Sequence, residues 1–398
     1  MNAAHWLACC LLAQMLPAGP IELARGTVTV GGEVTATFGS PDHIAFFNYT
    51  DYEHNALRMF RVSLSGMWRP SGRLALVTEF RSEDLRRVIP YALYARVRPW
   101  RTRAFDVQVG RIPPVFGAFA RRSYGTDNPL IGYPLAYQYL TSMRPDAIPA
   151  TADDLLLMRA RGWRVTYPVG SPQPGPGVPL ITAYRWDTGV EAHATAGMFD
   201  LSGAVTSGTL SNPRVTDDNR GKQFSGRVAI TPAVGLIVGV SGARGAFLTR
   251  ALADAYAAPD DHKYPQDAIG IDAEYSRGYF IVRGEAIRSR WHLPSIASPV
   301  IGGPLRTSSA FAEARYRFTP RYFAGARVDA LRFSEVTGHR LFNGQPTPWD
   351  APVKRIEAGG GVYLQRNLTL RAIVQRNWRD GGRVHDKTYL SGQLSYWF

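Results

Sequence analysis

The sequence has 398 residues and a formal net charge of +14 at pH 7, and only four of its 46 basic residues are lysines. Strongly basic chains can bind nucleic acid, but no helix-turn-helix, zinc-binding or RNA-binding motif occurs and the arginines are spread along the chain, so we predict no nucleic-acid partner. Beyond the amino-terminus, no stretch approaches the ~20 consecutive apolar residues of a membrane-spanning helix.

Residues 1–24 are predicted to form a secretory signal. The run from Trp6 to Leu16 is apolar, and we expect cleavage between about Ala18 and Ala24, although no basic residue precedes the run. Both cysteines of the chain, Cys9 and Cys10, lie in this run. The remainder, residues 25–398, is predicted to be one domain without thiols, which suits export through an oxidising periplasm.

From about residue 26 onwards, apolar and polar residues alternate in the way that half-buried β-strands do. In the segment 73–81 the even positions are apolar, while Glu79 and Arg81 point to the other face. The segment 310–318 repeats this pattern, with Glu313, Arg315 and Arg317 on one face. Charges confined to one face of many strands indicate a wet interior and an apolar exterior. We therefore predict an all-β fold, a transmembrane antiparallel β-barrel.

Short turns and long loops alternate along the chain, as expected when short turns face the periplasm and long loops face outside. We count about 18 strands, and 16 if the least certain hairpin, 190–210, is left out; either number encloses an aqueous channel. The predicted strands span 26–38, 57–68, 73–82, 88–98, 104–111, 154–167, 179–187, 190–198, 201–210, 222–231, 235–245, 267–276, 279–289, 306–318, 322–333, 353–364, 368–376 and 387–398.

The longest predicted connection, 112–153, is the third external loop. A loop of about forty residues without regular structure is uncommon unless it has a function or is disordered. Its many Phe and Tyr residues favour packing over disorder. We predict that it folds into the barrel and narrows the lumen, with Arg121, Arg122 and Arg144 at the pore constriction; the alternative is an ordered external cap.

Two stretches resemble a known family. Residues 109–117, with the sequence VGRIPPVFG, resemble the G-x-x-x-x-P-F-G motif of the phosphate-selective porin (O/P) family, with Val115 as an insertion. Residues 217–245 are similar to central strands of that family. The resemblance implies an outer-membrane porin of general-diffusion or anion-preferring type. It does not imply phosphate selectivity, because the family's phosphate-specific members line the constriction with arginine and lysine ladders, and lysine is nearly absent here.

Arginines outnumber carboxylates on the face that we predict to be inward. An excess of arginine is the expected lining of a pore that prefers anions, although each arginine could instead pair with a carboxylate on the neighbouring strand. The predicted lumen-lining residues are Arg61, Arg81, Arg96, Arg98, Arg159, Arg161, Arg283, Arg315, Arg317, Arg327 and Arg355.

The final segment, 387–398, has apolar residues at period two and ends in an aromatic residue. Tyr396 and Phe398 resemble the carboxy-terminal signal by which bacterial outer-membrane barrels are recognised for assembly. The segment therefore predicts location in the bacterial outer membrane, with the barrel-assembly machinery, outer-membrane lipid and lipopolysaccharide as partners. Homotrimers are common among wide barrels of this type, but the sequence identifies no interface.

The predicted function is passive diffusion of small hydrophilic solutes, anionic or neutral, with a mild anion preference. A substrate-specific uptake channel for organic acids, sugars or phosphate is the alternative. An outer-membrane barrel enzyme is a weaker one, because no histidine lies beside a defensible serine–acid pair. We predict no enzyme, no metal site and no cofactor.

Overall fold

The computed structural model describes residues 19–42, 47–50, 55–100, 102–216, 221–256, 264–294 and 296–398. Most of the predicted signal, residues 1–18, lies outside the described residues, so this prediction and its cleavage site stay untested. The last residues of the predicted signal include a short strand, β1 (Ile21–Leu23), which pairs with the first strand of the barrel.

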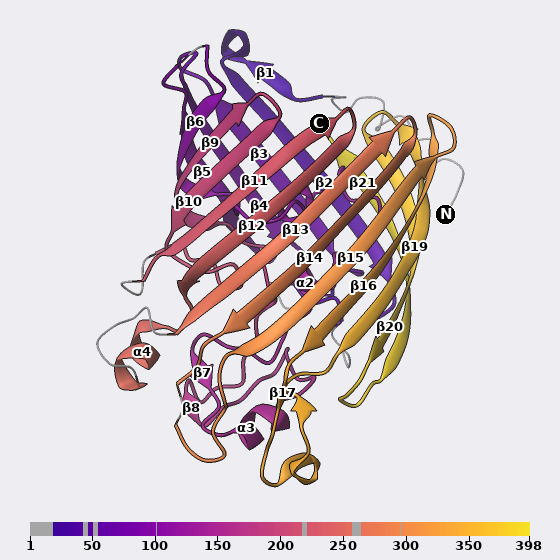
Figure 1. Cartoon of the computed structure of the whole chain (residues 1–398). Coiled ribbons are helices and arrows are strands. Elements are labelled where there is room, and N and C mark those ends of the chain that lie inside the picture. The colour runs from indigo at the N-terminus through magenta and orange to yellow at the C-terminus, as the bar shows by residue number, and fades with distance from the viewer. Residues whose placement is uncertain are drawn as a thin grey trace.

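Within the described residues, the main sheet has 17 strands, and all except β1 close into an antiparallel barrel of sixteen (Figure 1). The last strand pairs with the first, and the backbone N–H of Phe398 donates to the carbonyl of Gly32 at 3.0 Å. The barrel strands are β2 (Val28–Gly39), β3 (Phe60–Trp68), β4 (Leu74–Glu83), β5 (Arg87–Val97), β6 (Phe105–Ile112), β9 (Asp187–Ala196), β10 (Phe199–Thr206), β11 (Gln223–Ala233), β12 (Leu236–Ala246), β13 (Pro265–Arg277), β14 (Phe280–Trp291), β15 (Leu305–Arg317), β16 (Tyr322–Phe333), β19 (Val353–Gln365), β20 (Leu368–Arg379) and β21 (Asp386–Trp397).

The alternation of residues along the strands decides which face each side chain takes. In β4, Glu79 and Arg81 are buried inside, whereas Leu76 and Phe80 are exposed on the outside. Because side chains alternate with period two, the same division holds around the ring, and the predicted polar inner face and apolar outer face are confirmed.

The strand count is sixteen, but not for the reason we expected. The uncertain hairpin 190–210 is real and forms β9 and β10, whereas the predicted strands 154–167 and 179–187 do not exist. Both lie in the connection between β6 and β9, where α3 (Ala152–Leu157) begins with a capping box between Thr151 and Asp154.

The predicted places of Arg159 and Arg161 on barrel strands are therefore wrong. Both residues follow α3 in the external loop region, and Nη2 of Arg159 donates to the carbonyl of Asp380, in the loop between β20 and β21, at 3.0 Å. Arg161 is exposed.

Most of the smaller elements gather at the end of the barrel where the long loops lie, the lower end in Figure 1, whereas α2 (Leu135–Gln138) lies inside the barrel. Among the described residues, no helix is long and apolar enough to cross a membrane. These elements are η2 (Ala120–Arg122), α2 (Leu135–Gln138), β7 (Ala147–Ile148), β8 (Val169–Gly170), α4 (Arg250–Tyr256), β17 (Glu335–Val336), η4 (Leu341–Gly344) and β18 (Thr347–Pro348).

The hydrophobic core lies inside the barrel, at its external end. Here the inward positions of the strands are apolar, as in Trp291, Leu331 and Val353, and they pack against loop residues such as Leu135 and Ile148. The interior is thus charged along much of its length but dry where the loop packs.

The revised topology makes a testable prediction about sidedness. Leu157 of α3 is 52% exposed and Met198, in the turn between β9 and β10, is 51% exposed. We expect Leu157→Cys to react with a membrane-impermeant thiol reagent on intact cells. Met198→Cys, a matched control, should react only after the outer membrane is permeabilised. Equal labelling of both on intact cells would contradict the assignment of 154–187 to an external loop.

Candidate functional site

The third external loop, residues 113–186, joins β6 to β9 and enters the barrel; we call it the lumen loop. The backbone N–H of Gly117 donates to Oγ of Ser241 on β12 at 3.0 Å, and that of Gly125 donates to Oε1 of Glu33 on β2 at 3.0 Å. β12 and β2 lie on opposite sides of the strand ring. The lumen loop therefore crosses the barrel from wall to wall, whereas the sequence predicted only that the shorter segment 112–153 folds into the barrel.

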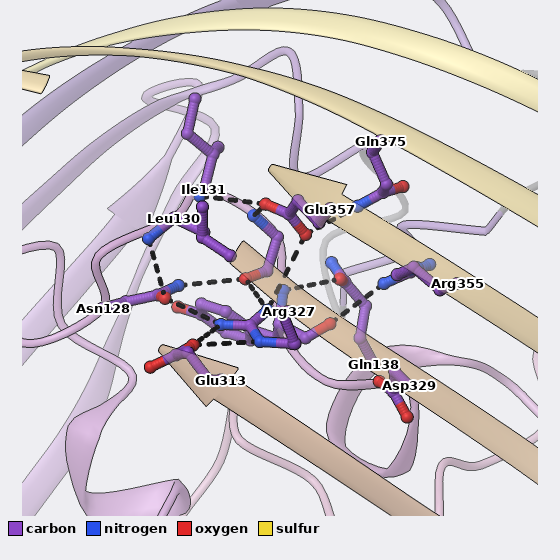
Figure 2. Close-up of polar contacts among 12 residues, drawn as sticks. Asn128, Leu130, Ile131, Gln138, Glu313, Arg327, Asp329, Arg355, Glu357 and Gln375 are labelled. Atoms are coloured by element: carbon purple, nitrogen blue, oxygen red, sulfur yellow. Dashed lines mark hydrogen bonds and ion pairs between the residues drawn. The ribbon is translucent and has the colours of Figure 1, made fainter. Parts of the chain in front are cut away.

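Inward-facing carboxylates accept hydrogen bonds from this loop. Oε1 of Glu357 accepts from the backbone N–H groups of Ile131 and Gly132, at 3.2 and 2.9 Å, and Figure 2 shows these contacts. The backbone N–H of Leu135 donates to Asp329. A buried backbone donor without a partner is costly, so these carboxylates replace the strand pairing that an irregular segment lacks.

Gly132 lies close against two side chains of the barrel wall. A Cβ there would lie 2.5 Å from Oε2 of Glu357 and 2.6 Å from Nε2 of Gln375. Any other residue at this position would have to displace the ends of these two side chains.

Arg327 of β16 lies at the centre of the contacts drawn in Figure 2. Its Nη1 donates to the carbonyl of Gly132 at 2.7 Å, its Nη2 to Oδ1 of Asn128 at 2.9 Å, and its Nε to Glu313 at 3.0 Å. The Arg327 side chain has no exposed surface. This arginine faces inward as predicted, but it holds the loop and a carboxylate rather than facing open water.

Arg355 of β19 serves the loop in the same way. Its Nη1 donates to the carbonyl of Tyr133 at 2.9 Å, and its Nη2 donates to the carbonyl of Phe47, in the first external loop, at 2.7 Å. One guanidinium therefore joins the wall to two loops.

Three further arginines that we predicted to line the lumen point inward, and each one forms hydrogen bonds or ion pairs. Arg61 donates to the hydroxyl of Tyr133 at 2.9 Å and forms an ion pair with Glu83. The guanidinium of Arg81 forms an ion pair with Glu79 and lies 3.5 Å from the ring centre of Tyr91. Arg283 donates to the carbonyl of Asp127 at 3.0 Å and forms an ion pair with Glu274.

The remaining predicted arginines lie toward the end of the barrel with the short turns. Arg96, Arg315 and Arg317 lie on inward-facing positions of β5 and β15 and form no ion pair within the described residues. Arg317 contacts Tyr363, whose hydroxyl lies 3.4 Å from its Nη2. Arg98 is exposed one residue beyond β5.

The three residues predicted at the constriction are placed differently from one another. Arg122 lies on η2 and forms an ion pair with Glu274 on β13. Arg144 is buried within the loop, where its Nη1 donates to the carbonyls of Val165 and Gln173 at 2.7 and 2.8 Å. The side chain of Arg121 lies outside the described parts of the structure.

The external part of the lumen loop is held by Asp350, in the connection between β16 and β19. Its carboxylate accepts from the backbone N–H groups of Ser142 and Ala160, at 2.6 and 2.8 Å. Burial raises the pKa of Asp350, and the backbone donors partly offset this effect. No cluster of metal-ligating side chains occurs in the part of the chain that the structure describes.

The carboxylates that receive the loop were not among the predicted site residues. Glu285, Asp329 and Glu357 were expected, at most, to offset the charge of inward arginines, and Glu33 was given no role. The hydroxyl of Tyr137 in fact donates to Glu285 at 2.8 Å. Their inward position was visible in the period-two pattern, but the pattern does not indicate what crosses the lumen beside them.

No protein-family model and no curated protein matches this chain. Solved structures that are similar in fold include OmpT of Vibrio cholerae, with a TM-score of 0.54 at 11% identity, covering 95% of this chain and 100% of that one. An anion-selective porin from Comamonas acidovorans has a TM-score of 0.54 at 11% identity, covering 93% and 99%. OmpF of Salmonella typhi, solved with daunomycin, has a TM-score of 0.53 at 11% identity, covering 95% and 100%.

These comparisons establish the fold but not the family. The resemblance to the phosphate-selective porins is not confirmed and stays a prediction. With its closed sixteen-strand barrel and apolar outer face, this chain has the fold of the outer-membrane porins, and that fold places it in the bacterial outer membrane.

Proposed function

We propose that this chain forms an outer-membrane channel for passive diffusion of small hydrophilic solutes, and that the lumen loop sets its aperture. The observation that supports this proposal is the loop itself, hydrogen-bonded to β12 and to β2 on opposite walls. A barrel of sixteen strands is too wide to be filled by its own wall side chains. The width that remains open to solutes is therefore decided by where this loop lies.

A mild anion preference is part of the proposal, and it rests on fewer arginines than the sequence suggested. Most inward arginines are neutralised by carboxylates or held by loop carbonyls. Arg96, Arg315 and Arg317 form no ion pair in the described structure and leave positive charge in the lumen, although Glu313 lies near Arg315 and offsets part of it. In a confined channel such charge raises the local anion concentration, and salt screens the effect.

The proposed partners are small anionic or neutral solutes, outer-membrane lipid, lipopolysaccharide and the barrel-assembly machinery, which would recognise Tyr396 and Phe398. A homotrimer is the proposed assembly; it is supported by a trimer form of the similar OmpT, with a TM-score of 0.50. The porin fold favours a channel over an enzyme.

A substrate-specific uptake channel is the second candidate. The many bonds that hold the lumen loop across the barrel favour a narrow passage, where a solute would contact the walls. This candidate is supported if phosphate, a sugar or an organic acid blocks the ion current in a concentration-dependent way. An unblocked, ohmic current supports general diffusion instead.

Conductance is the direct test of the channel. We expect purified protein in a planar bilayer to produce discrete current steps, with a reversal potential in a salt gradient that favours anions. Absence of current from barrels shown to be folded by heat-modifiable migration would mean that the loop closes the lumen, and it would contradict the proposal.

The selectivity is expected to depend on the unpaired arginines. Arg315→Glu combined with Arg317→Glu should shift the reversal potential toward cations, because two positive charges in the lumen become negative. The matched control is Arg306→Glu with Arg332→Glu, which makes the same charge change on outward-facing positions of β15 and β16. Equal shifts in both variants would show that the lumen arginines do not determine selectivity.

The docking of the loop is expected to depend on Arg327. Arg327→Ala removes the partner of Glu313 and the donor to Gly132, and breaking a buried pair costs about 3–5 kcal/mol. Amide hydrogen exchange across residues 125–135 should become much faster than in the wild type. Arg376→Ala, an outward change on β20, is the control. Unchanged protection in Arg327→Ala would contradict the role given to this network.

A further inference from the structure

One part of the outer surface of the barrel carries basic side chains where a lipid-facing wall is otherwise apolar. They lie near the external ends of neighbouring strands from β12 to β20 and all are exposed. A charge facing lipid is costly at the membrane centre and nearly free of cost near the interface. We call this surface the basic wall; it consists of Arg244, Arg288, Arg290, Arg306, Arg332, Lys354 and Arg376.

Strand register brings these side chains together. Arg290 of β14 is paired with Arg306 of β15, and Arg288 is paired with Ser308, whose other neighbour is Arg332. Side chains directly opposite each other on paired strands have Cβ atoms about 4.5–5.5 Å apart. Arg288, Arg290, Arg306 and Arg332 therefore form one cluster across three strands.

Little negative charge balances this cluster. Asp267 of β13 forms ion pairs with Arg244 and Arg290, at 2.9 and 2.8 Å, and His292 lies 3.0 Å from it. Asp386 pairs with Arg376 at 2.8 Å. Arg288, Arg306, Arg332 and Lys354 form no ion pair within the described residues.

The wall is hollowed next to the cluster. One hollow of about 330 Å³ is lined by Arg288, Arg290 and Arg306 together with Asp267, Ala268 and Ile269. A second, of about 380 Å³, has Arg332, Lys354, Arg379 and Trp378 in its lining, together with the carboxylates of Asp380 and Asp386. Both are rimmed by guanidinium or ammonium groups that point away from the barrel.

An apolar groove of about 440 Å³ lies further from the external end. Small side chains make the dent, because Ala310 and Ala330 are paired with each other in register and Val328 and Ile356 form its sides. Lys354 and Trp378 line both this groove and the second basic hollow. The second hollow and the apolar groove therefore adjoin each other, whereas the first hollow shares no lining residue with the groove.

The other side of the barrel lacks this arrangement. The outward positions near the external ends of β2, β5, β10 and β11 are Phe38, Val88, Val205 and Phe224, and all four are exposed. The basic wall is thus a local feature of strands β12 to β20. An even distribution of the many arginines around the barrel would not produce it.

We propose that the basic wall binds lipid A, the phosphorylated and multiply acylated glycolipid of the outer leaflet. Arginine is the side chain best suited to hold phosphate, through paired charge-assisted hydrogen bonds. Phosphate groups occupy the two basic hollows, and an acyl chain lies in the alanine groove. The proposal rests on the outer-membrane location and does not depend on whether the lumen conducts.

The chemistry of the wall favours this occupant over a second copy of the chain. A two-fold interface between copies would bring the same arginines near one another, and the four-arginine cluster carries one sign of charge. A free phosphate ion would use the hollows but would leave the apolar groove without a role.

The test is binding of bisphosphorylated, hexa-acylated lipid A to the detergent-purified full-length barrel, measured by titration in native mass spectrometry. The variant combines Arg288→Gln, Arg306→Gln and Arg332→Gln. Each of the three lost charges should weaken binding about fivefold, as for a basic residue near an anionic membrane surface, so we expect affinity to fall about a hundredfold. The control combines Arg277→Gln, Arg321→Gln and Arg366→Gln, three exposed arginines at the opposite end of the barrel, and it should bind like the wild type.

A second variant tests the groove without changing charge. Ala310→Leu with Ala330→Leu fills the dent, and it should weaken lipid A binding while the three arginines remain. Heat-modifiable migration confirms the folded state of every variant.

Four outcomes would overturn the proposal. These are wild-type affinity in the arginine variant, an equal loss in the control at the opposite end, competition by inorganic phosphate as effective as lipid A itself, and equal binding of phosphatidylglycerol. Loss confined to the two basic-wall variants would establish the site. Conductance is independent of these readouts, so a failure here is distinguishable from a failure of the channel proposal.

Discussion

The structure depends on one constraint, which is that an irregular chain segment inside a barrel must satisfy its backbone hydrogen bonds without a sheet to pair with. The inward side chains of the strands meet that requirement. Glu357 accepts from two consecutive backbone N–H groups, while Arg327 and Arg355 donate to the loop carbonyls at 132 and 133. Because these groups are buried and charged, each one needs the others. Removing a single partner would leave an uncompensated charge in a dry environment, so the loop and the wall form one cooperative unit.

This constraint changes how the basic composition should be understood. Arginine in a porin-like lumen suggests a lining for anions, yet most of the inward arginines here bind carboxylates or loop carbonyls. The charge that remains for solutes is confined to a few residues toward the short-turn end, such as Arg315 and Arg317. A different set of arginines faces outward at the external margin. The same residue type therefore appears in three settings, holding a loop, lining a passage and facing lipid.

Much of the fold could be predicted from the sequence because a barrel strand exposes one face to lipid and the other to the interior, and the period-two pattern reports that division directly. The error at 154–167 had a local cause. A threonine followed three residues later by an acid, here Thr151 and Asp154, marks a helix start, but Thr151 was assigned to the end of a loop and Asp154 to the first position of a strand. The site was harder to predict. The pattern places Glu357 and Asp329 inward, but it cannot distinguish a carboxylate that pairs with a neighbouring arginine from one that accepts a loop backbone, because that depends on how a distant segment crosses the lumen.

The most direct test of the account is the single-channel conductance of a barrel whose loop has been released from the wall. In a variant that combines Arg327→Ala with Glu357→Ala, the contacts at the centre of the loop are lost while the strands remain intact. The account predicts larger current steps than in the wild type under the same salt and voltage, because the loop sets the aperture. Hydrogen exchange would show whether the loop of this variant is mobile. If it is mobile and the current steps still equal those of the wild type, the claim that the loop sets the aperture is contradicted.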